Sequence, residues 1–530
     1  MPSVILFKPN NKYYTDEKNN SSFRFLFFIL PVHLFCQSTG IGTASPHASA
    51  QLDITSSNKG MLPPRMTNVQ RDAISNPAPG LMIFSTDDQY LQVFTSIGWL
   101  SIERDNFPIE KLLGGTAQEQ YPFIQKTTDG GYILAGRSTS SANGNVSGTN
   151  HGLGDYWIVK LDAHGVILWD KLLGGNNDEA AFSIQQTTDG GYIVTGASNS
   201  SANGNVSGTN HGNSDYWILK LDAYGIINWN KLLGGNGSEL SYSIMQTTDG
   251  GYIVAGYSTS SANGDVTGAN HGFLDSWIIK LDAAGNIVWN KQLGGDNDEE
   301  ALTIQQTTDG GYIVAGYSFS SANGDVTGTN HGLNDYWIVK LDVAGNITWN
   351  KLLGGTSNDY ATTIQQTADG GYVVAGYSRS SANGNVTGVN HGLKDYWIVK
   401  LDAAGNITWN KLLGGNNDDV AYSILQTNDG GYIVAGASKS SANGDVTGTN
   451  HGLNDYWIVK LDGGGNITWN KLVGGNNDDI AYSIQKCAAG GYIIAGYSGS
   501  SSNGDITGVN NGLIDYWVIR LDASGNIIYQ

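Results

Sequence analysis

A sixty-residue repeat constrains this chain more than any other feature of its sequence. The stretch DYWIVKLDAAGNITWNKLLGG at residues 395–415 recurs along the chain with small changes. Full copies begin at Lys111, Lys171, Lys231, Lys291, Lys351, Lys411 and Lys471. A fixed period of this length is typical of proteins that repeat one supersecondary unit. The seven copies therefore predict a repeat architecture for residues 106–530.

Each copy contains four strand-like runs and no stretch with helical periodicity. In the copy that starts at Lys291, the expected strands are residues 301–307, 312–317, 337–342 and 347–353. An Asp-Gly turn joins the first two strands, and a long loop separates the second from the third. Four antiparallel strands per copy favour a propeller blade. The alternative, an open β-solenoid, needs atypical capping copies, whereas the first and last copies here are nearly as regular as the others.

The sequence therefore predicts an all-β protein, in which a seven-bladed β-propeller of four-stranded antiparallel blades follows a small mixed N-terminal segment. Two segments compete to complete the last blade. Residues 106–115 (NFPIEKLLGG) match a fourth strand with its glycines, whereas residues 526–530 (NIIYQ) are a shortened fourth strand. We favour the N-terminal strand because it carries the whole motif, and because joining the two ends of the ring removes an open sheet edge.

The N-terminus carries an apolar run at residues 25–35, preceded by Arg24. This run is too short to span a bilayer, so we interpret residues 1–36 as a signal peptide that is cleaved after Cys36. A lipoprotein anchor at Cys36 and a buried core strand are the alternatives. Cleavage leaves Cys487 as a lone thiol, so no disulfide is expected. We expect Sec-type export to the extracellular space or the cell surface, with no transmembrane segment in the mature chain.

Residues 37–105 share nothing with the repeats. Thr67 is the expected N-cap of a short helix that runs through Ile74, and residues 81–99 alternate as a β-hairpin. The pattern TGIGTASPHASAQLDITSSNKGMLPPRMT, followed by PGLMIFSTD and GW, resembles a segment common in exported and tail-fibre-like proteins of Bacteroidetes. The resemblance implies a surface stalk or adaptor. The alternative is a linker that packs on the next domain.

The repeats themselves also resemble a known family. The run DYWIVKLDAAGNITWNKLLGGNNDD, followed by DGGYIVAGYS, resembles the bacterial beta-propeller repeat family, also called the seven-bladed propeller repeat, over residues 106–530. The resemblance implies a secreted or cell-surface protein, and most members of the family have no assigned activity. The formal net charge of −19 agrees with this class, because it argues against nucleic acid and anionic membranes as partners.

Both long loops of a blade emerge on one face of a propeller, so we expect the binding site there. An acidic residue follows the double glycine in every copy and lies just before the innermost strand: Glu119, Glu179, Glu239, Glu299, Asp359, Asp419 and Asp479. If they ring the mouth of the central channel, these carboxylates could hold a structural Ca²⁺ ion. The favoured alternative is that each accepts hydrogen bonds from loop N–H groups in its own blade. No other cofactor is expected.

Three further sets occupy the same loops. The residues before the third strand are expected to form Asx turns or strand-entry caps: Asp155, Asp215, Asp275, Asp335, Asp395, Asp455 and Asp515. A long-loop position alternates between Asp (Asp265, Asp325, Asp445, Asp505) and Asn (Asn145, Asn205, Asn385), as a turn tolerates. Six of the seven copies have a histidine at one loop position, and each lies too far from its equivalents for one metal ion to bind them all: His151, His211, His271, His331, His391 and His451.

Tryptophans recur on the third strand, as at Trp217, and on the fourth strand, as at Trp229. A sugar-binding platform is one interpretation, but packing between neighbouring blades is favoured. No phosphate loop, Cys/His metal motif or Ser-His-Asp order occurs, so no catalytic residues are predicted.

Three functions remain open. The first is a secreted or cell-surface binding and adhesion scaffold, a monomeric propeller that meets a glycan or protein on its long-loop face. The second is a glycan-active hydrolase or lyase on the same scaffold, which we disfavour because near-identical copies lack the asymmetry of an enzyme site. The third is a purely structural spacer.

Overall fold

The computed structural model describes residues 39–41, 52–57, 60–87, 91–95, 98–101, 110–487 and 490–528. The chain divides into two compact units, Met1–Glu103 and Arg104–Gln530. The predicted signal peptide, with Cys36, lies outside the described residues. The all-β prediction is confirmed, because α1 (Asn68–Asp72) is the one helix among the described residues.

The first unit is small. Strand β1 (Thr39–Ile41) pairs in parallel with β2 (Leu52–Ile54), and a second sheet has the order β3 (Arg65–Met66), β4 (Met82–Ser85), β5 (Leu91–Thr95) and β6 (Gly98–Ser101). The predicted N-cap is present, since Thr67 and Gln70 form a reciprocal capping box at the start of α1. The helix ends at Asp72, two residues before the predicted end.

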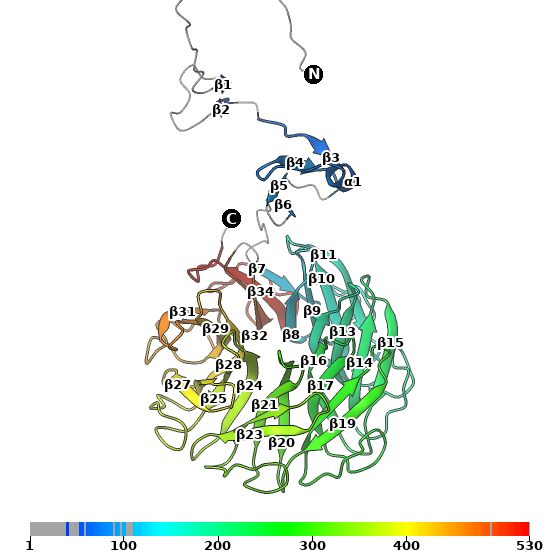
Figure 1. The fold of residues 1–530 in the computed structure, drawn as a ribbon, viewed down its shortest axis with the longest axis vertical. Helices are drawn as coiled ribbons and strands as arrows, with labels where there is room; N and C mark the ends of the chain where they lie inside the picture. Colours follow the sequence, from blue (N-terminus) through cyan, green and yellow to red (C-terminus); the bar gives the residue numbers. More distant parts are fainter. Residues whose placement is uncertain are drawn as a thin grey trace, which may run out of the picture. The chain divides into compact units, whose positions relative to one another are not determined.

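The second unit is a ring of seven four-stranded antiparallel sheets (Figure 1), so the predicted seven-bladed propeller is confirmed. Blades 1 and 2 contain β8 (Glu119–Lys126), β9 (Tyr132–Ser138), β10 (Asp155–Leu161), β11 (Ile167–Leu173), and β12 (Glu179–Gln186), β13 (Tyr192–Ser198), β14 (Asp215–Leu221), β15 (Ile227–Leu233). Blades 3 and 4 contain β16 (Glu239–Gln246), β17 (Tyr252–Ser258), β18 (Asp275–Leu281), β19 (Ile287–Leu293), and β20 (Glu299–Gln306), β21 (Tyr312–Ser318), β22 (Asp335–Leu341), β23 (Ile347–Leu353).

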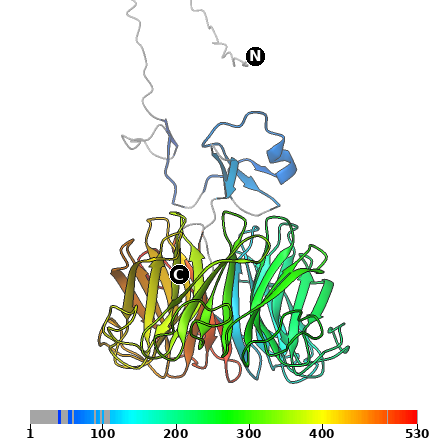
Figure 2. The same ribbon diagram turned by 60° about the horizontal axis from the view of Figure 1, so that its bottom comes forward.

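Blades 5 and 6 contain β24 (Asp359–Gln366), β25 (Tyr372–Ser378), β26 (Asp395–Leu401), β27 (Ile407–Leu413), and β28 (Asp419–Gln426), β29 (Tyr432–Ser438), β30 (Asp455–Leu461), β31 (Ile467–Val473). Blade 7 contains β32 (Asp479–Lys486), β33 (Tyr492–Ser498), β34 (Asp515–Leu521) and, as its fourth strand, β7 (Glu110–Leu113). The first strands of successive blades contact one another all round the ring, so they lie innermost around the central axis. Figure 2 shows the ring of blades nearly from the side.

Strand β7 closes the ring, as the sequence predicts. It pairs antiparallel with β34, with Leu112 opposite Trp517. Glu110 completes the joint, because its Oε1 accepts the indole N–H of Trp517 at 3.1 Å and its Oε2 accepts the backbone N–H of Thr507 at 2.7 Å. In blade 2 the same indole bond goes to an asparagine, with 3.3 Å between Trp217 Nε1 and Asn230 Oδ1. Strand β7, which precedes the first full copy, therefore makes in blade 7 the contacts that the fourth strand of the same copy makes in other blades.

Tryptophans on the third strands pack between blades and do not form an exposed platform. Trp217 is fully buried, and its ring centroid lies 4.6 Å from that of Tyr156 in the preceding blade. The Tyr156 hydroxyl also donates to the backbone oxygen of Trp217 at 3.0 Å. Each third strand is buried on both faces, since neighbouring blades cover it on either side. Burial of this apolar surface is the main source of stability in the ring.

Candidate functional site

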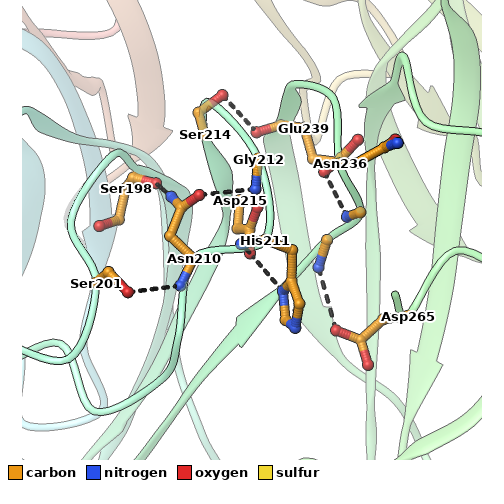
Figure 3. A network of polar contacts seen from close by, with 12 residues as sticks. Ser198, Ser201, Asn210, His211, Gly212, Ser214, Asp215, Asn236, Glu239 and Asp265 are labelled. Atoms are coloured by element: carbon orange, nitrogen blue, oxygen red, sulfur yellow. Dashed lines mark hydrogen bonds and ion pairs between the residues drawn. The ribbon is translucent and has the colours of Figure 1, made fainter. Parts of the chain in front are cut away.

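The long loops of each blade are pinned by hydrogen bonds that recur from copy to copy. In blade 2, the N–H of Asn210 donates to Ser201 Oγ at 3.1 Å, and its side-chain amide donates to the carbonyl of Ser198 at 3.0 Å (Figure 3). The Asn210 side-chain oxygen accepts the N–H of Gly212 at 2.9 Å. These bonds satisfy loop backbone groups and hold the long-loop face as a rigid surface.

The acidic residues that open the innermost strands are part of this framework. Glu239 Oε2 accepts the N–H of Gly235 at 2.8 Å, and its Oε1 accepts the hydroxyls of Ser258 and Ser260 at 2.8 and 2.7 Å. All seven members of the set are fully buried: Glu119, Glu179, Glu239, Glu299, Asp359, Asp419 and Asp479. They therefore do not form an open ring around the channel mouth. Each carboxylate instead accepts bonds from a glycine N–H and serine hydroxyls of its own blade, which is the arrangement that the sequence analysis favours.

The structure brings two of the predicted sets together, pair by pair, across every blade interface. Asp215, at the start of the third strand of blade 2, faces Glu239 of blade 3 (Figure 3). Gly234 lies between them, and a Cβ on this residue would come within 2.5 Å of Asp215 Oδ1 and 2.6 Å of Glu239 Oε2. The first glycine of the double-glycine motif is thus required by the close approach of two carboxylates.

The histidines attach to the same pairs. His211 Nδ1 lies 2.9 Å from Asp215 Oδ2, and the His211 backbone N–H donates to that oxygen at 3.1 Å. The other oxygen, Asp215 Oδ1, is buried and has no hydrogen-bond partner among the described residues, and the same holds for its six equivalents. Each histidine therefore serves the aspartate of its own blade. Among the described residues, no group of three or more His, Cys, Asp and Glu side chains is placed to hold a metal ion.

Burial raises the pKa of the aspartates in these pairs, because a charged carboxylate loses its water there. The pKa rises to about 6 for Asp359 and Asp419, and to about 7 for Asp479 and Asp515. Asp515 belongs to the closing interface, where Asn511 replaces the histidine and donates at 2.8 Å from its backbone and 3.2 Å from its amide. The facing Glu119 also contributes to the raised pKa of Asp515.

The position that alternates between Asp and Asn has a structural role that either residue fulfils. Asp265 Oδ2 accepts the N–H of Gly234 at 3.2 Å, and Asn205 Oδ1 accepts the N–H of Gly174 at 3.1 Å. Both residue types offer one oxygen at this point, so their interchange follows from the hydrogen bond and requires no bound cation.

The central channel contains a cavity of about 600 Å³ that is lined by the innermost strands of all seven blades. Five of these strands contribute an aromatic ring, and the rings follow one another in the order Tyr422, Tyr482, Tyr121, Phe182 and Tyr242. Successive ring centroids lie 5.0, 6.0, 5.5 and 5.5 Å apart. Blades 4 and 5 place Leu302 and Thr362 at this position. The channel wall is therefore aromatic on one side only.

Tyr121 joins this aromatic arc through a local change in the backbone. In blade 2, Phe182 is the single extra residue of a β-bulge between Ala181 and Ser183. In blade 1 the irregularity extends from Gln120 to Phe123 because it includes Pro122, which has no N–H to donate. Tyr121 adopts a φ of 58° and places its ring between those of Phe182 and Tyr482.

The sequence prediction missed the aromatic arc and the asymmetric channel. The available signal was variation between copies at one position of the first strand, where Pro, Phe, Tyr, Leu and Thr occur inside an otherwise constant motif. The prediction followed what the copies share, and shared residues here build the scaffold.

Comparisons with known proteins give one family match and two relatives of low identity. Residues 40–116 match a family described as a phage tail like trimerisation region, in line with the resemblance to tail-fibre-like proteins. A regulatory protein of Caulobacter vibrioides, FlaEY, is 23% identical over 53% of this chain and 32% of its own length. An uncharacterized WD repeat-containing protein of Acanthamoeba polyphaga mimivirus is 21% identical over 61% of this chain and 29% of its own length. The chain thus spans about a third of these relatives.

Solved structures that match this chain include the Neurospora crassa Pan2 WD40 domain, with a TM-score of 0.43 and 10% identity over 80% of this chain and 98% of that one. A Dyadobacter fermentans protein of unknown function has a TM-score of 0.38 and 11% identity over 77% and 96% of the two chains. The assignment of a seven-bladed propeller rests on the strand pairing of this chain itself. No helix among the described residues is long and apolar enough to cross a membrane.

Proposed function

We propose that this propeller is a secreted or cell-surface binding module of the propeller-repeat family, and that it holds a glycan on its long-loop face. The proposal rests on the contrast between the loop positions, which are nearly constant from copy to copy, and the channel positions, which vary. Residues that pin the loops are the same in nearly every copy, whereas side chains near the channel differ from blade to blade and are rich in tyrosine. Tyrosine offers a flat apolar ring and a hydroxyl, which suits a sugar.

The buried carboxyl pairs argue against the hydrolase or lyase alternative. A glycosidase needs an acid and a base that reach the substrate. Glu239 and its equivalents are instead buried and held by serine hydroxyls and a glycine N–H. The spacer alternative leaves the asymmetric channel without a role.

A glycan array probed with the purified full chain tests the proposal, with EDTA present in a parallel experiment. Binding to a defined set of glycans supports it, and the absence of binding to any glycan refutes it. Capture of a protein in place of a glycan also refutes it. Loss of binding or a lower Tm with EDTA would support a structural Ca²⁺ ion, which is the less favoured interpretation of the acidic set, and an unchanged Tm would remove it. Mass spectrometry of the exported chain tests cleavage before Gln37.

A second proposal concerns the first unit, for which we infer a trimeric state. Among its described residues, Ile83 is the one buried hydrophobic side chain, whereas Leu62 and Val69 are 77% and 80% exposed. A unit of this size with so little core needs a partner. The match of residues 40–116 to a trimerisation region supports three copies of this chain, which would present three propellers and gain avidity.

Light scattering on the eluting protein measures the mass directly. We expect the mass of three chains for the wild type and of one chain for a Leu62→Asp, Val69→Asp double variant. Leu153→Asp, at a propeller side chain that is 69% exposed, is the matched control and should leave the trimer intact. A wild-type mass of one chain would establish the monomer expected from the sequence.

A further inference from the structure

A second cavity lies at the long-loop end of blades 1 to 3, outside the carboxyl pairs described above. It has a volume of about 410 Å³. Asp178 and Ser214, which precede β12 and β14, and Asn199, which follows β13, place the cavity at this end of the strands. We call it the blade-2 pocket. A cavity of this size holds one or two sugar rings.

The blade-2 pocket exists because two alanines face each other. Ala180 and Ala197 are cross-strand partners on β12 and β13. In blade 5 the same two positions hold Tyr360 and Tyr377, whose rings stack with centroids 5.0 Å apart. At the equivalent positions of the other five blades, at least one of the two residues is larger than alanine. Blade 2 is therefore hollow where the other blades are filled.

The polar wall of the pocket is a hydrogen-bonded network in which Arg137 and Asp178 pair their opposite charges. The Arg137 guanidinium donates to Asp178 Oδ1 from Nη2 at 2.6 Å and from Nε at 3.0 Å. Its Nη1 donates to Gln120 Oε1 at 3.3 Å. Because Asp178 balances the charge of Arg137, the wall suits hydroxyl groups better than a carboxylate or a phosphate. Asn199 and Ser214 add further polar groups to the lining.

The opposite wall is aromatic and belongs to the channel arc. The rings of Tyr121 and Phe182 lie 5.5 Å apart and both line the pocket. Tyr121 is 37% exposed, so part of its ring is open to a ligand. Its φ of 58° is unfavourable for a residue with a side chain, and strained backbone of this kind gathers at functional sites.

We propose that the blade-2 pocket binds one neutral hexose unit, which stacks on Tyr121 and Phe182 and exchanges hydrogen bonds with the Arg137–Asp178–Gln120 wall. This rests on the proposed glycan-binding function and gives it a location and a ligand class. The pocket combines an aromatic wall with paired polar groups, which is the complement of a sugar ring with its apolar face and hydroxyl edge.

The repeat itself supplies the test variant and its control. Ala197→Tyr fills the pocket with the residue that Tyr257, Tyr317, Tyr377 and Tyr497 place at this position in other blades, so the fold accommodates it. Ala437→Tyr makes the same change in blade 6 and is the matched control. Ala180→Leu, which copies Leu240 of blade 3, is a second pocket-filling variant if Ala197→Tyr fails to fold.

Saturation-transfer NMR with the methyl glycosides of glucose, galactose and mannose measures binding to the full chain, and methyl glucuronide serves as the anionic comparison. We expect at least one neutral hexoside to bind, a loss of at least tenfold in affinity for Ala197→Tyr, and no change for Ala437→Tyr. No hexoside binding to the wild type, equal binding by Ala197→Tyr, or a preference for the glucuronide overturns the proposal. If the glycan array is positive while these variants bind normally, the pocket is refuted and the glycan-binding function stands.

Discussion

The closing interface should make the propeller lose stability as the pH rises, and one aspartate should carry much of this effect. Asp515 is fully buried and its Oδ1 has no hydrogen-bond partner. Its Oδ2 accepts bonds from the backbone and the amide of Asn511, and its carboxyl group faces that of Glu119. At the equivalent place, Asp155 has His151 Nδ1 at 2.8 Å, which can bring a positive charge, and Asn511 cannot.

The size of this loss of stability follows from the pKa of Asp515. Burial raises this pKa from 3.8 to about 7, which is a difference of about 3 units. A pKa that is higher in the folded than in the unfolded chain contributes stability that is present below pH 3.8 and is lost as the pH rises through 7. Each unit corresponds to about 1.4 kcal/mol, so the loss between pH 4 and pH 8 is on the order of 4 kcal/mol.

Asp515→Asn removes this titration while keeping the shape of the side chain, and its amide can donate to Glu119. We expect the variant to unfold at a higher temperature than the wild type at pH 8, and to show a smaller difference at pH 5, where Asp515 carries a proton. Scanning calorimetry at pH 5, 6.5 and 8, at constant ionic strength, measures the three differences.

Asp155→Asn is the matched control at an interface that contains a histidine. The increase in Tm of this variant over the wild type at pH 8 should be smaller than that of Asp515→Asn, because His151 already stabilises the charged form of Asp155. A Tm for Asp515→Asn that falls below that of the wild type at pH 8 would show that Asp515 is stabilising in its charged form, and the reasoning from burial would be wrong.

Three further predictions concern the scaffold. Glu110→Ala should lower the free energy of unfolding by about 2 kcal/mol, because it leaves the N–H groups of Trp517 and Thr507 without their acceptor. Denaturant titration measures this difference, and an unchanged midpoint would show that Glu110 does not stabilise the pairing of β7 with blade 7. Trp217→Ala should lower the free energy of unfolding by about 3–5 kcal/mol in the same titration, because it opens a cavity between two blades. A decrease below about 1 kcal/mol would contradict close packing at this interface. Burial raises the pKa of Asp189, but bonds from Thr187, Lys220 and Gly191, together with the charge of Lys220, lower it to about 2. The contribution of Asp189 to stability should therefore be present above pH 3.8 and lost as the pH falls through 2. In an acid titration followed by circular dichroism, an Asp189→Asn variant should be less sensitive to this pH range than the wild type.

The blades could be predicted because the signals for them are local. Alternating apolar residues, Asp-Gly turns and a constant period specify strands and hairpins within each sixty-residue copy. The closing strand was also predictable, because residues 106–115 repeat the motif of a fourth strand and the open edge of blade 7 needs a partner. The strand limits differed slightly: β20 begins at Glu299, two residues before the expected start.

The candidate site could be predicted only in part. The sequence located the acidic residues, the aspartates and the histidines in the long loops, and it indicated the face on which they lie. It did not indicate that Asp215 and Glu239 share one buried interface, because their distance depends on how blade 2 packs against blade 3. Their burial agrees with the favoured alternative, in which loop groups of the same blade hold each acidic residue, and not with an open ring at the channel mouth.

The sequence alone determined what is repeated in this protein, namely the strand, the turn and the number of blades, because these depend on neighbours within one copy. The tertiary structure decided what differs between blades. The aromatic arc needs five blades to bring their rings together, and the blade-2 pocket needs Ala180 and Ala197 to face each other under the loops of the adjacent blades. Such features arise from contacts between copies. The sequence shows how the copies differ, but it does not show which residues of different copies lie next to one another in space.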